Sequence, residues 1–299
     1  MKWWLGRKYN KTDVMWAFVM IAPNLLGLMF FYMWPVIQTF YFSFTEWGDF
    51  GKYHWAGLSN YETMLHDPDV WHTLRNTLLY TFLSVPISIA LSIVVATLLN
   101  QKIKFVYVYR TLYFLPVVTM PAAVAMVWKW LFNSDYGLLN QLLHKLSIDG
   151  PMWLTDPMVA PFAVILVGVW SSIGYNMVIF LAGLQGISKS YYEAADLDGA
   201  GFIRKFWTIT LPILSPTVFF ASLISIINAF QVFDLIWMMI GDKNISLDTT
   251  QSLVYFFYEQ AFVLNNEGYA AAVAMLLFAL IMIVTIIQMK LQNKWVHYE

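Results

Sequence analysis

Six long apolar intervals, separated by short polar stretches, dominate the pattern of residues along this chain. Each interval is nearly free of charged residues and can supply the roughly 20 apolar residues that cross a bilayer core as a helix. We therefore predict six membrane-spanning helices, over Val14–Thr45, Asn76–Gln101, Thr111–Trp128, Pro157–Ser188, Phe206–Phe233 and Gly268–Met289. An even number of spans places both chain ends on the same side of the membrane.

The composition supports an integral membrane protein, because 60% of the 299 residues are hydrophobic and only 12% are charged. The loops contain no low-complexity linker, so we expect one all-α domain over residues 14–290, flanked by residues 1–13 and 291–299. The apolar run behind the basic N-terminal segment is too long for a cleavable signal peptide, which indicates a retained first helix. Short loop helices are expected near Asn60–Leu65 and Leu138–Leu146.

The basic residues are distributed unevenly between the two sides that six spans define. Twelve of the 17 Lys and Arg residues fall on the side of the chain ends: Lys2, Arg7, Lys8, Lys11, Lys102, Lys104, Arg110, Lys189, Arg204, Lys205, Lys290 and Lys294. Because cytoplasmic loops of membrane proteins are enriched in Lys and Arg, this side is predicted to be the cytoplasm, with both termini there. No basic run with interleaved aromatic residues suggests a nucleic-acid partner.

A polar segment separates the fourth and fifth apolar intervals. Ser190 and Glu193 have the spacing of a capping box, so we expect a short helix that begins at Ser190. Gly199 then allows a sharp break, and helical spacing resumes at Phe202. Pro212 should kink or restart this second helix inside the membrane. The predicted result is an L-shaped protrusion on the cytoplasmic face.

Residue types that carry catalysis or bind metals are sparse in this chain. The sequence has no cysteine, and its five histidines lie in loops or in the C-terminal tail without the spacing of a metal motif. It contains neither a GxxxxGK[ST] phosphate-binding loop nor a GxSxG nucleophile motif. We therefore assign no catalytic and no metal-binding residue and expect no cofactor in this chain. If the protein performs energy-dependent work, the nucleotide must bind another subunit.

The polar segment also contains a longer motif. Glu193-Ala194-Ala195, followed at fixed intervals by Gly199, Ile209, Leu211 and Pro212, is similar to the EAA signature of the membrane subunits of bacterial binding-protein-dependent ABC importers. FYMWPVIQTFYFSFTEW, NTLLYTFLSVPISIALSIVVATLLN, YRTLYFLPVVTMPAAVAMVWKWLFNSDYGLLN and GYAAAVAMLLFALIMIVTIIQ resemble the carbohydrate branch of that family, the maltose, multiple-sugar and glycerol-phosphate group. The similarity extends from about Val14 to Gln288 and implies a type I permease fold.

The resemblance implies a role for the polar segment and a set of partners. A coupling helix within about residues 190–205 would dock on an ATPase subunit through Tyr191, Tyr192, Glu193, Ala194, Ala195, Leu197, Asp198, Gly199 and Phe202. The implied partners are a second homologous permease, two ATPase subunits that bind ATP and Mg²⁺, and an extracellular or periplasmic solute-binding protein. The implied location is the bacterial cytoplasmic membrane. The implied substrate is a carbohydrate, with an oligosaccharide preferred.

Two groups of polar and aromatic residues inside the spans are candidates for the substrate pathway, because polar groups in a membrane usually face a cavity or a partner helix. In the fifth span Asn228, Gln231 and Asp234 recur at a spacing of three, which predicts one helix stripe in the outer half of the membrane. Phe230 and Phe233 lie beside them in sequence. The fourth span holds the second group, formed by Trp170, Ser171, Ser172, Tyr175 and Asn176.

Amide, carboxylate and aromatic groups suit a sugar, and the resemblance places substrate contacts in these two helices. Hydrogen bonding between subunits, or for Asp234 a position at the outer membrane interface, would explain the same residues without a substrate. A glycerol-phosphate permease is an alternative, which the sequence disfavours because no Arg cluster lies near the candidate residues. A secondary transporter would predict acidic residues in mid-span or inverted repeats, and a membrane-embedded enzyme would need a catalytic constellation; the sequence shows neither.

Overall fold

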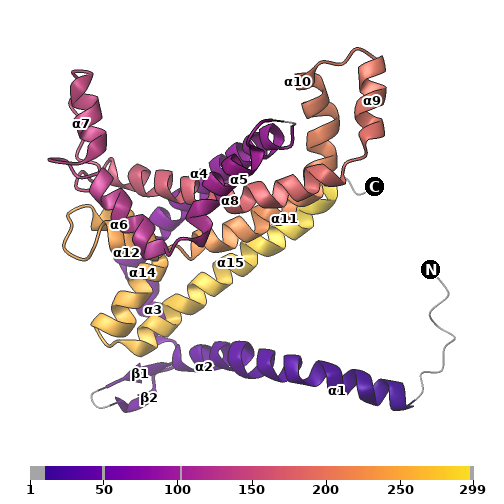
Figure 1. The fold of residues 1–299 in the computed structure, drawn as a ribbon. Helices are drawn as coiled ribbons and strands as arrows, with labels where there is room; N and C mark the ends of the chain where they lie inside the picture. The colour runs from indigo at the N-terminus through magenta and orange to yellow at the C-terminus, as the bar shows by residue number, and fades with distance from the viewer. Residues whose placement is uncertain (1–10, 49–50, 102, 297–299) are drawn as a thin grey trace.

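The computed structural model describes residues 11–48, 51–101 and 103–296, and nearly all of them lie in helices or in the turns between helices (Figure 1). Five continuous helical stretches are long and apolar enough to cross a membrane: Val14–Phe42, Pro68–Leu99, Ala160–Gly186, Phe202–Phe230 and Glu267–Lys294. They correspond to five of the six predicted spans.

Several of these stretches contain more than one helical element. The first comprises α1 (Lys11–Leu28), the π-helical turn η1 (Met29–Met33) and α2 (Trp34–Phe42). The second and third are α4 (Pro68–Leu99) and α8 (Ala160–Gly186). The fourth comprises α10 (Phe202–Lys205), the π-helical turn η3 (Phe206–Thr210) and α11 (Leu211–Phe230), and the fifth is α15 (Glu267–Trp295).

The third predicted span is wrong as a single straight helix. Its residues form α5 (Val106–Val118) and α6 (Pro121–Leu131), which meet at an angle of 102°. The break falls at Thr119 and Met120, both of which have extended ψ angles. The ring of Pro121 clashes with a helical conformation of the residue before it, and at the first position of α6 its missing N–H costs nothing. Pro121 was therefore the signal in the sequence that predicts this break.

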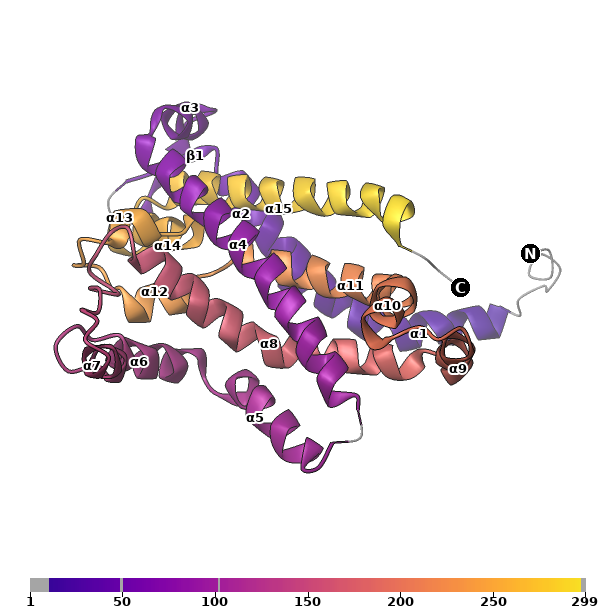
Figure 2. The ribbon, with the colours of Figure 1, turned by 90° about the horizontal axis from the view of Figure 1, so that it is seen from above.

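α4, α8 and α11 cross one another in the centre of the molecule (Figures 1 and 2). Buried apolar side chains pack between these helices, including Val85 from α4, Phe180 from α8 and Leu214 from α11. The buried face of α4 also carries small hydroxyl residues at spacings of three and four: Thr73, Thr77, Thr81, Ser84, Ser88 and Ser92. Such small side chains let helix backbones approach closely in a membrane.

The first span stands apart from this centre. None of its most apolar 18-residue window is buried, and Figure 1 shows α1 extending away from the other helices. Its C-terminal part, α2, packs on another span, α15. Near this junction Gly268 lies so close to β1 (Thr45–Trp47) that an added Cβ would be 1.9 Å from the carbonyl oxygen of Thr45.

The end of the molecule opposite α9 (Lys189–Leu197) and α10 carries the longer loops (Figure 1). Two helices predicted there are confirmed, as α3 (Ser59–His66) and α7 (Leu138–Lys145). The sequence analysis missed a short antiparallel hairpin of β1 (Thr45–Trp47) and β2 (Tyr53–Trp55) with Thr45 opposite Trp55. The remaining short elements are α12 (Asp234–Met239), α13 (Leu247–Thr250), α14 (Leu253–Tyr258) and the π-helical turn η4 (Glu259–Val263).

Candidate functional site

The polar segment between α8 and α11 forms a helical hairpin, α9–α10, rather than the predicted L shape. α9 and α10 lie side by side in both views of the molecule (Figures 1 and 2). Lys205 forms an ion pair with Asp196, and the hydroxyls of Tyr192 and Thr210 are hydrogen-bonded at 3.0 Å. These contacts fold α10 back against α9.

Both ends of α9 are capped by local hydrogen bonds. The N-cap lies two residues earlier than predicted: it is Ser188, whose side chain accepts a hydrogen bond from the backbone N–H of Ser190. At the other end Gly199 has φ +70°, Ala200 donates to the carbonyl of Ala195, and Gly199 donates to that of Asp196. This is the Schellman arrangement, in which a left-handed glycine ends a helix. The predicted break at Gly199 is confirmed, and the capping box at Ser190 is wrong.

The helix that follows the hairpin is continuous into the membrane. α10 passes through η3 into α11, so Pro212 sits in the first turn of α11 directly behind a π-helical turn. The wider turn accommodates the missing N–H of the proline locally. The predicted restart at Pro212 is wrong, because the helix continues through this residue, and the predicted kink there stays a prediction.

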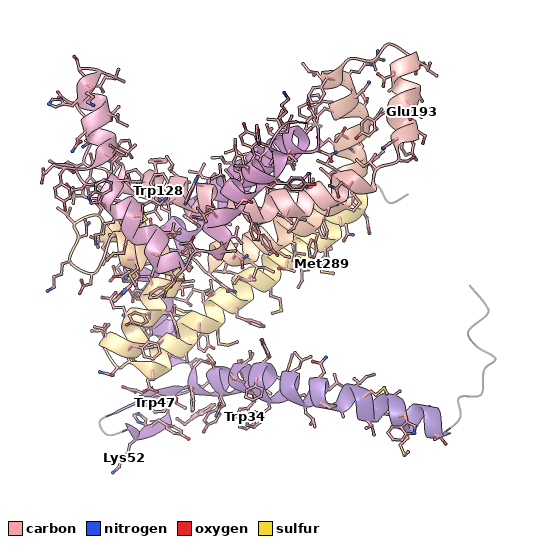
Figure 3. The ribbon with its side chains drawn as sticks, viewed as in Figure 1. Trp34, Trp47, Lys52, Trp128, Glu193 and Met289 are labelled. Atoms are coloured by element: carbon pink, nitrogen blue, oxygen red, sulfur yellow. The ribbon has the colours of Figure 1, made fainter. Side chains whose placement is uncertain are left out.

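The residues predicted for ATPase coupling divide between two faces of the hairpin. Leu197 is 91% exposed at the end of α9, and Glu193 lies on the outer side of the same helix (Figure 3). The other exposed members are Tyr191, Ala194, Asp198, Gly199 and Phe202. Ala195 is buried and Tyr192 is half-buried, because both face the interior of the chain. These two residues therefore pack against the rest of this chain.

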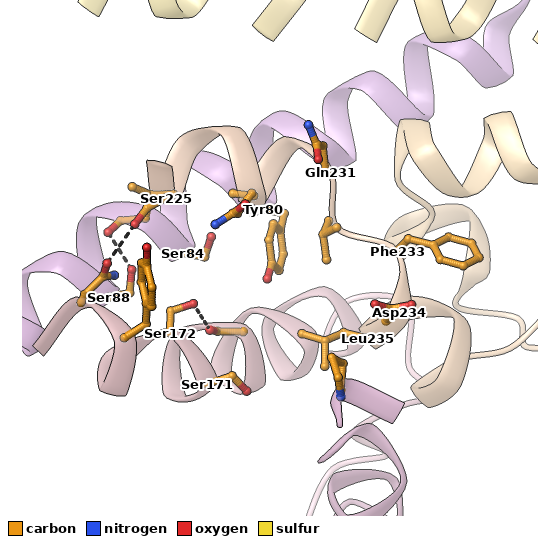
Figure 4. Close-up of a pocket in the computed structure, with 18 of the residues that line it drawn as sticks. Tyr80, Ser84, Ser88, Ser171, Ser172, Ser225, Gln231, Phe233, Asp234 and Leu235 are labelled. Atoms are coloured by element: carbon orange, nitrogen blue, oxygen red, sulfur yellow. Dashed lines mark hydrogen bonds between the residues drawn. The ribbon is translucent and has the colours of Figure 1, made fainter. Parts of the chain in front are cut away.

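A second feature is a cavity of about 480 Å³ between α4, α8, α11 and α12 (Figure 4). Eight of the ten residues predicted for the substrate pathway line it: Ser171, Ser172, Tyr175, Asn176, Asn228, Gln231, Phe233 and Asp234. Two predicted residues lie outside the lining. Phe230 is buried in the protein, and the ring of Trp170 packs against Trp128 at 5.4 Å between ring centroids.

The predicted helix stripe of Asn228, Gln231 and Asp234 is wrong. α11 ends at Phe230, and α12 begins only at Asp234. Gln231 therefore caps one helix while Asp234 opens the next. The three side chains still reach the same cavity because the chain turns around it between the two helices.

Hydrogen bonds fix several groups of this cavity. Ser172 donates to the backbone carbonyl of Gly168 at 2.8 Å, and Ser225 donates to the side-chain oxygen of Asn176 at 3.3 Å. The hydroxyl oxygen of Ser171 is buried and has no hydrogen-bond partner among the described residues. Tyr80 reaches across from α4 so closely that a Cβ on Gly168 would lie 2.1 Å from its hydroxyl oxygen.

The sequence analysis missed the contribution of α4 to the cavity. Tyr80, Ser84 and Ser88 line it from this helix, as Figure 4 shows. Their signal was present in the sequence as hydroxyl residues that recur every three or four positions within an apolar span. Such a stripe indicates one polar helix face, but it does not distinguish a cavity from close helix packing.

An aromatic cluster supports the cavity where α12 meets α14. The rings of Phe233 and Trp237 stack with 5.7 Å between centroids, and both contact Tyr258 at 5.1 and 4.9 Å. Tyr255 is buried behind them, and burial, together with the carboxylate of Glu259 nearby, raises its pKa to about 12. Its hydroxyl is therefore neutral at physiological pH, and the cluster adds no charge beside the carboxylate of Asp234.

No group of three or more His, Cys, Asp or Glu side chains that could hold a metal ion occurs among residues 11–48, 51–101 and 103–296.

Residues 76–298 match the family described as the binding-protein-dependent transport system inner membrane component. The chain belongs to this family. The resemblance seen in the sequence is thereby confirmed, and this binding-protein-dependent permease is a multi-pass protein of the inner membrane.

Relatives of this permease are themselves transport subunits. It is 33% identical to the arabinooligosaccharides transport system permease protein AraP of Bacillus subtilis over 297 residues, which cover 98% of this chain and 92% of AraP. It is 33% identical over 285 residues to the sn-glycerol-3-phosphate transport system permease protein UgpA of Agrobacterium fabrum, with 94% of this chain and 96% of UgpA covered. The prediction of a transport subunit rather than an enzyme is confirmed.

The fold of the permease also matches a solved transporter. A crystal structure of a bacterial ABC transporter involved in the import of the acidic polysaccharide alginate aligns with a TM-score of 0.84 over 95% of this chain and 96% of that chain. The two sequences are 19% identical, so the likeness concerns the fold. Together with the family match, it confirms the predicted helical fold of a membrane subunit of an ABC importer.

Proposed function

We propose that this chain is one of two membrane subunits of an ATP-driven importer that passes an oligosaccharide from a solute-binding protein into the cytoplasm. A second, homologous permease would supply the other half of the pathway, and two ATPase subunits would bind ATP and Mg²⁺. The family membership and the name of the AraP relative support this proposal. The observation that carries the sugar class is the chemistry of the cavity between α4, α8, α11 and α12.

The cavity gathers the groups that a sugar requires. Sugar hydroxyls need both donors and acceptors, which the amides of Asn176, Asn228 and Gln231 provide, while the C–H faces of a sugar ring pack on flat apolar surface. The tyrosine and phenylalanine rings in the lining offer such surface. The volume of about 480 Å³ falls within the roughly 300–1,000 Å³ of small-molecule sites.

The same lining disfavours a phosphorylated substrate. Asp234 is the one Asp, Glu, Lys or Arg among the described lining residues, and its carboxylate would repel a phosphate. Phosphate groups are usually held by Arg or Lys side chains, which form charge-assisted hydrogen bonds with them. Although UgpA is as similar to this chain as AraP is, the cavity therefore favours a neutral sugar over glycerol phosphate.

The α9–α10 hairpin is the proposed ATPase contact on the cytoplasmic side. The first described turn of α1 and the last turn of α15 lie at the same end of the helices as the hairpin, in agreement with the distribution of Lys and Arg (Figure 1). The continuous path from α10 through η3 into α11 joins this end to Asn228 in the cavity. A displacement of the hairpin would therefore move one wall of the cavity as part of a rigid-body motion.

The proposal is tested by transport in proteoliposomes that contain the permease pair, its ATPase and its solute-binding protein. ATP-dependent uptake of a labelled arabinooligosaccharide is expected, with little uptake of labelled glycerol 3-phosphate. Asp234→Asn should lower kcat/KM about tenfold or more, because a hydrogen bond to a charged group contributes about 1.5–3 kcal/mol.

Asp242→Asn is the matched control, since this exposed carboxylate lies outside the cavity. Equal uptake by both variants and the wild type would refute the role of Asp234. Uptake that proceeds without ATP would refute the importer itself and favour a secondary transporter.

A further inference from the structure

A second cavity, of about 250 Å³, lies beneath the α9–α10 hairpin and is separate from the substrate cavity. It is enclosed by the C-terminal end of α4, the end of α8, and the hairpin with η3. Thr97, Asn100 and Gln101 line it from the α4 side, and Tyr192, Lys205 and Thr210 line it from the hairpin side. The cavity thus bridges a membrane-spanning helix and the segment proposed to contact the ATPase.

The polar part of this cavity is rich in donors and carries positive charge. Lys205 is the one ionisable residue with a full charge in the described lining, and no carboxylate belongs to that lining. Its side chain is only 18% exposed, in keeping with its ion pair with Asp196, because Lys is almost never buried unless it is paired. An ammonium group has three donors, and the one described acceptor for Lys205 is Asp196, whose side chain is 67% exposed.

The two amides at the end of α4 add to this donor set. Asn100 and Gln101 are exposed, and their side chains make no hydrogen bond to any part of the chain that the structure describes, so each offers two N–H donors. The apolar part of the lining consists of Leu184, Phe202 and Phe206. A site with one ammonium, several free donors and an apolar wall fits an anion attached to an apolar or partly apolar body.

We propose that this cavity binds a phosphate group through Lys205 and the amides of Asn100 and Gln101, with Asp196 displaced from the lysine. The group can come from an anionic phospholipid headgroup or from a soluble phosphate ester, since both carry the same anion. The position at the ends of α4 and α8, where two spans end, places the site at the membrane boundary. Basic pockets between transmembrane helices at this depth are typical binding sites for anionic headgroups.

A bound phosphate would connect α4 to the hairpin. It would replace the contact within the hairpin between Lys205 and Asp196 by a contact that reaches Asn100 and Gln101, directly after α4. Occupancy of the site would therefore restrain movement of the hairpin relative to α4. The inference goes beyond the proposed import of a sugar and does not depend on which substrate the importer carries.

The test uses the purified importer assembly in detergent. Native mass spectrometry measures retention of phosphatidylglycerol against phosphatidylcholine, and isothermal titration calorimetry with inorganic phosphate measures binding of the free anion. Lys205→Gln should weaken binding at least about tenfold, because it removes the charge from a charge-assisted hydrogen bond. Asp196→Asn should strengthen binding, because it removes the competing carboxylate and leaves the lysine.

Arg204→Gln is the matched control, since this exposed residue neighbours Lys205 but does not line the cavity. Selective phosphatidylglycerol retention by the wild type identifies a lipid headgroup, whereas phosphate binding without lipid retention identifies a soluble ligand. The proposal is overturned if the wild type binds neither probe. It is also overturned if Asp196→Asn weakens binding as much as Lys205→Gln does, because the ion pair would then have only a structural role.

Discussion

Leu197 provides the sharpest test of the hairpin as a contact surface. Its side chain is 91% exposed, so it contributes almost nothing to the stability of the isolated chain but can be buried by a partner. Leu197→Ala removes three carbon groups, each of which contributes about 0.8 kcal/mol when buried. Scaled by the exposed fraction, the loss in binding is about 2 kcal/mol, or about a 30-fold increase in Kd. By contrast, Leu214→Ala in the buried centre should cost about 2–5 kcal/mol of unfolding free energy.

The assay is surface plasmon resonance between the ATPase subunit and the permease pair in nanodiscs, together with thermal denaturation of each variant. Ile245→Ala is the control, because Ile245 is 73% exposed in the loop between α12 and α13, at the end of the molecule opposite the hairpin (Figure 1). We expect a weaker ATPase interaction for Leu197→Ala only, with an unchanged melting temperature. An unchanged Kd for Leu197→Ala, or an equal loss for Ile245→Ala, would refute the docking surface.

Three glycine substitutions test other parts of the structure. Gly199→Ala places a Cβ at φ +70°, which costs about 1 kcal/mol of unfolding free energy, so the melting temperature should fall; Gly199→Asn should restore part of it, and an unchanged melting temperature for Gly199→Ala would contradict the left-handed helix end. Gly168→Ala should displace the hydroxyl of Tyr80 and raise the KM of uptake, and an unchanged KM would contradict the role of this cavity wall. In Gly268→Ala the added Cβ would clash with the backbone carbonyl of Thr45. The resulting overpacking should cost about 1–3 kcal/mol or more of unfolding free energy and lower the melting temperature; unchanged stability would show that β1 moves freely.

The hairpin shows which local features could be predicted. The break at Gly199 was predictable because a left-handed helix end strongly favours glycine, and the structure has φ +70° there. The N-cap of α9 was placed two residues too late, since Ser188 and Ser190 are both good capping residues and the sequence does not decide between them. The return of α10 against α9 depends on contacts such as that of Tyr192 with Thr210, which are distant in sequence.

The lining of the substrate cavity could be predicted only in part. The polar residues of α8 could be grouped from the sequence because they lie on consecutive turns of one helix. Asn228, Gln231 and Asp234 were assigned to one stripe by their spacing, yet they reach the cavity from the end of one helix and the start of another. Tyr80 joins them from a helix far away in sequence, and its position depends on the absence of a side chain at Gly168.

The sequence by itself determined the membrane class, five of the helical spans, the polar segment with its glycine break and the family motif. These properties follow from apolar run length, backbone preference and residue spacing, which act within a few turns of chain. Only the tertiary structure decided which side chains meet and how the helices are arranged. It set the 102° angle of the bend before Pro121, the burial of Ala195 and the lining of the two cavities. Those outcomes depend on the packing of helices that are distant in sequence, where small residues and side-chain volumes set the distance of approach.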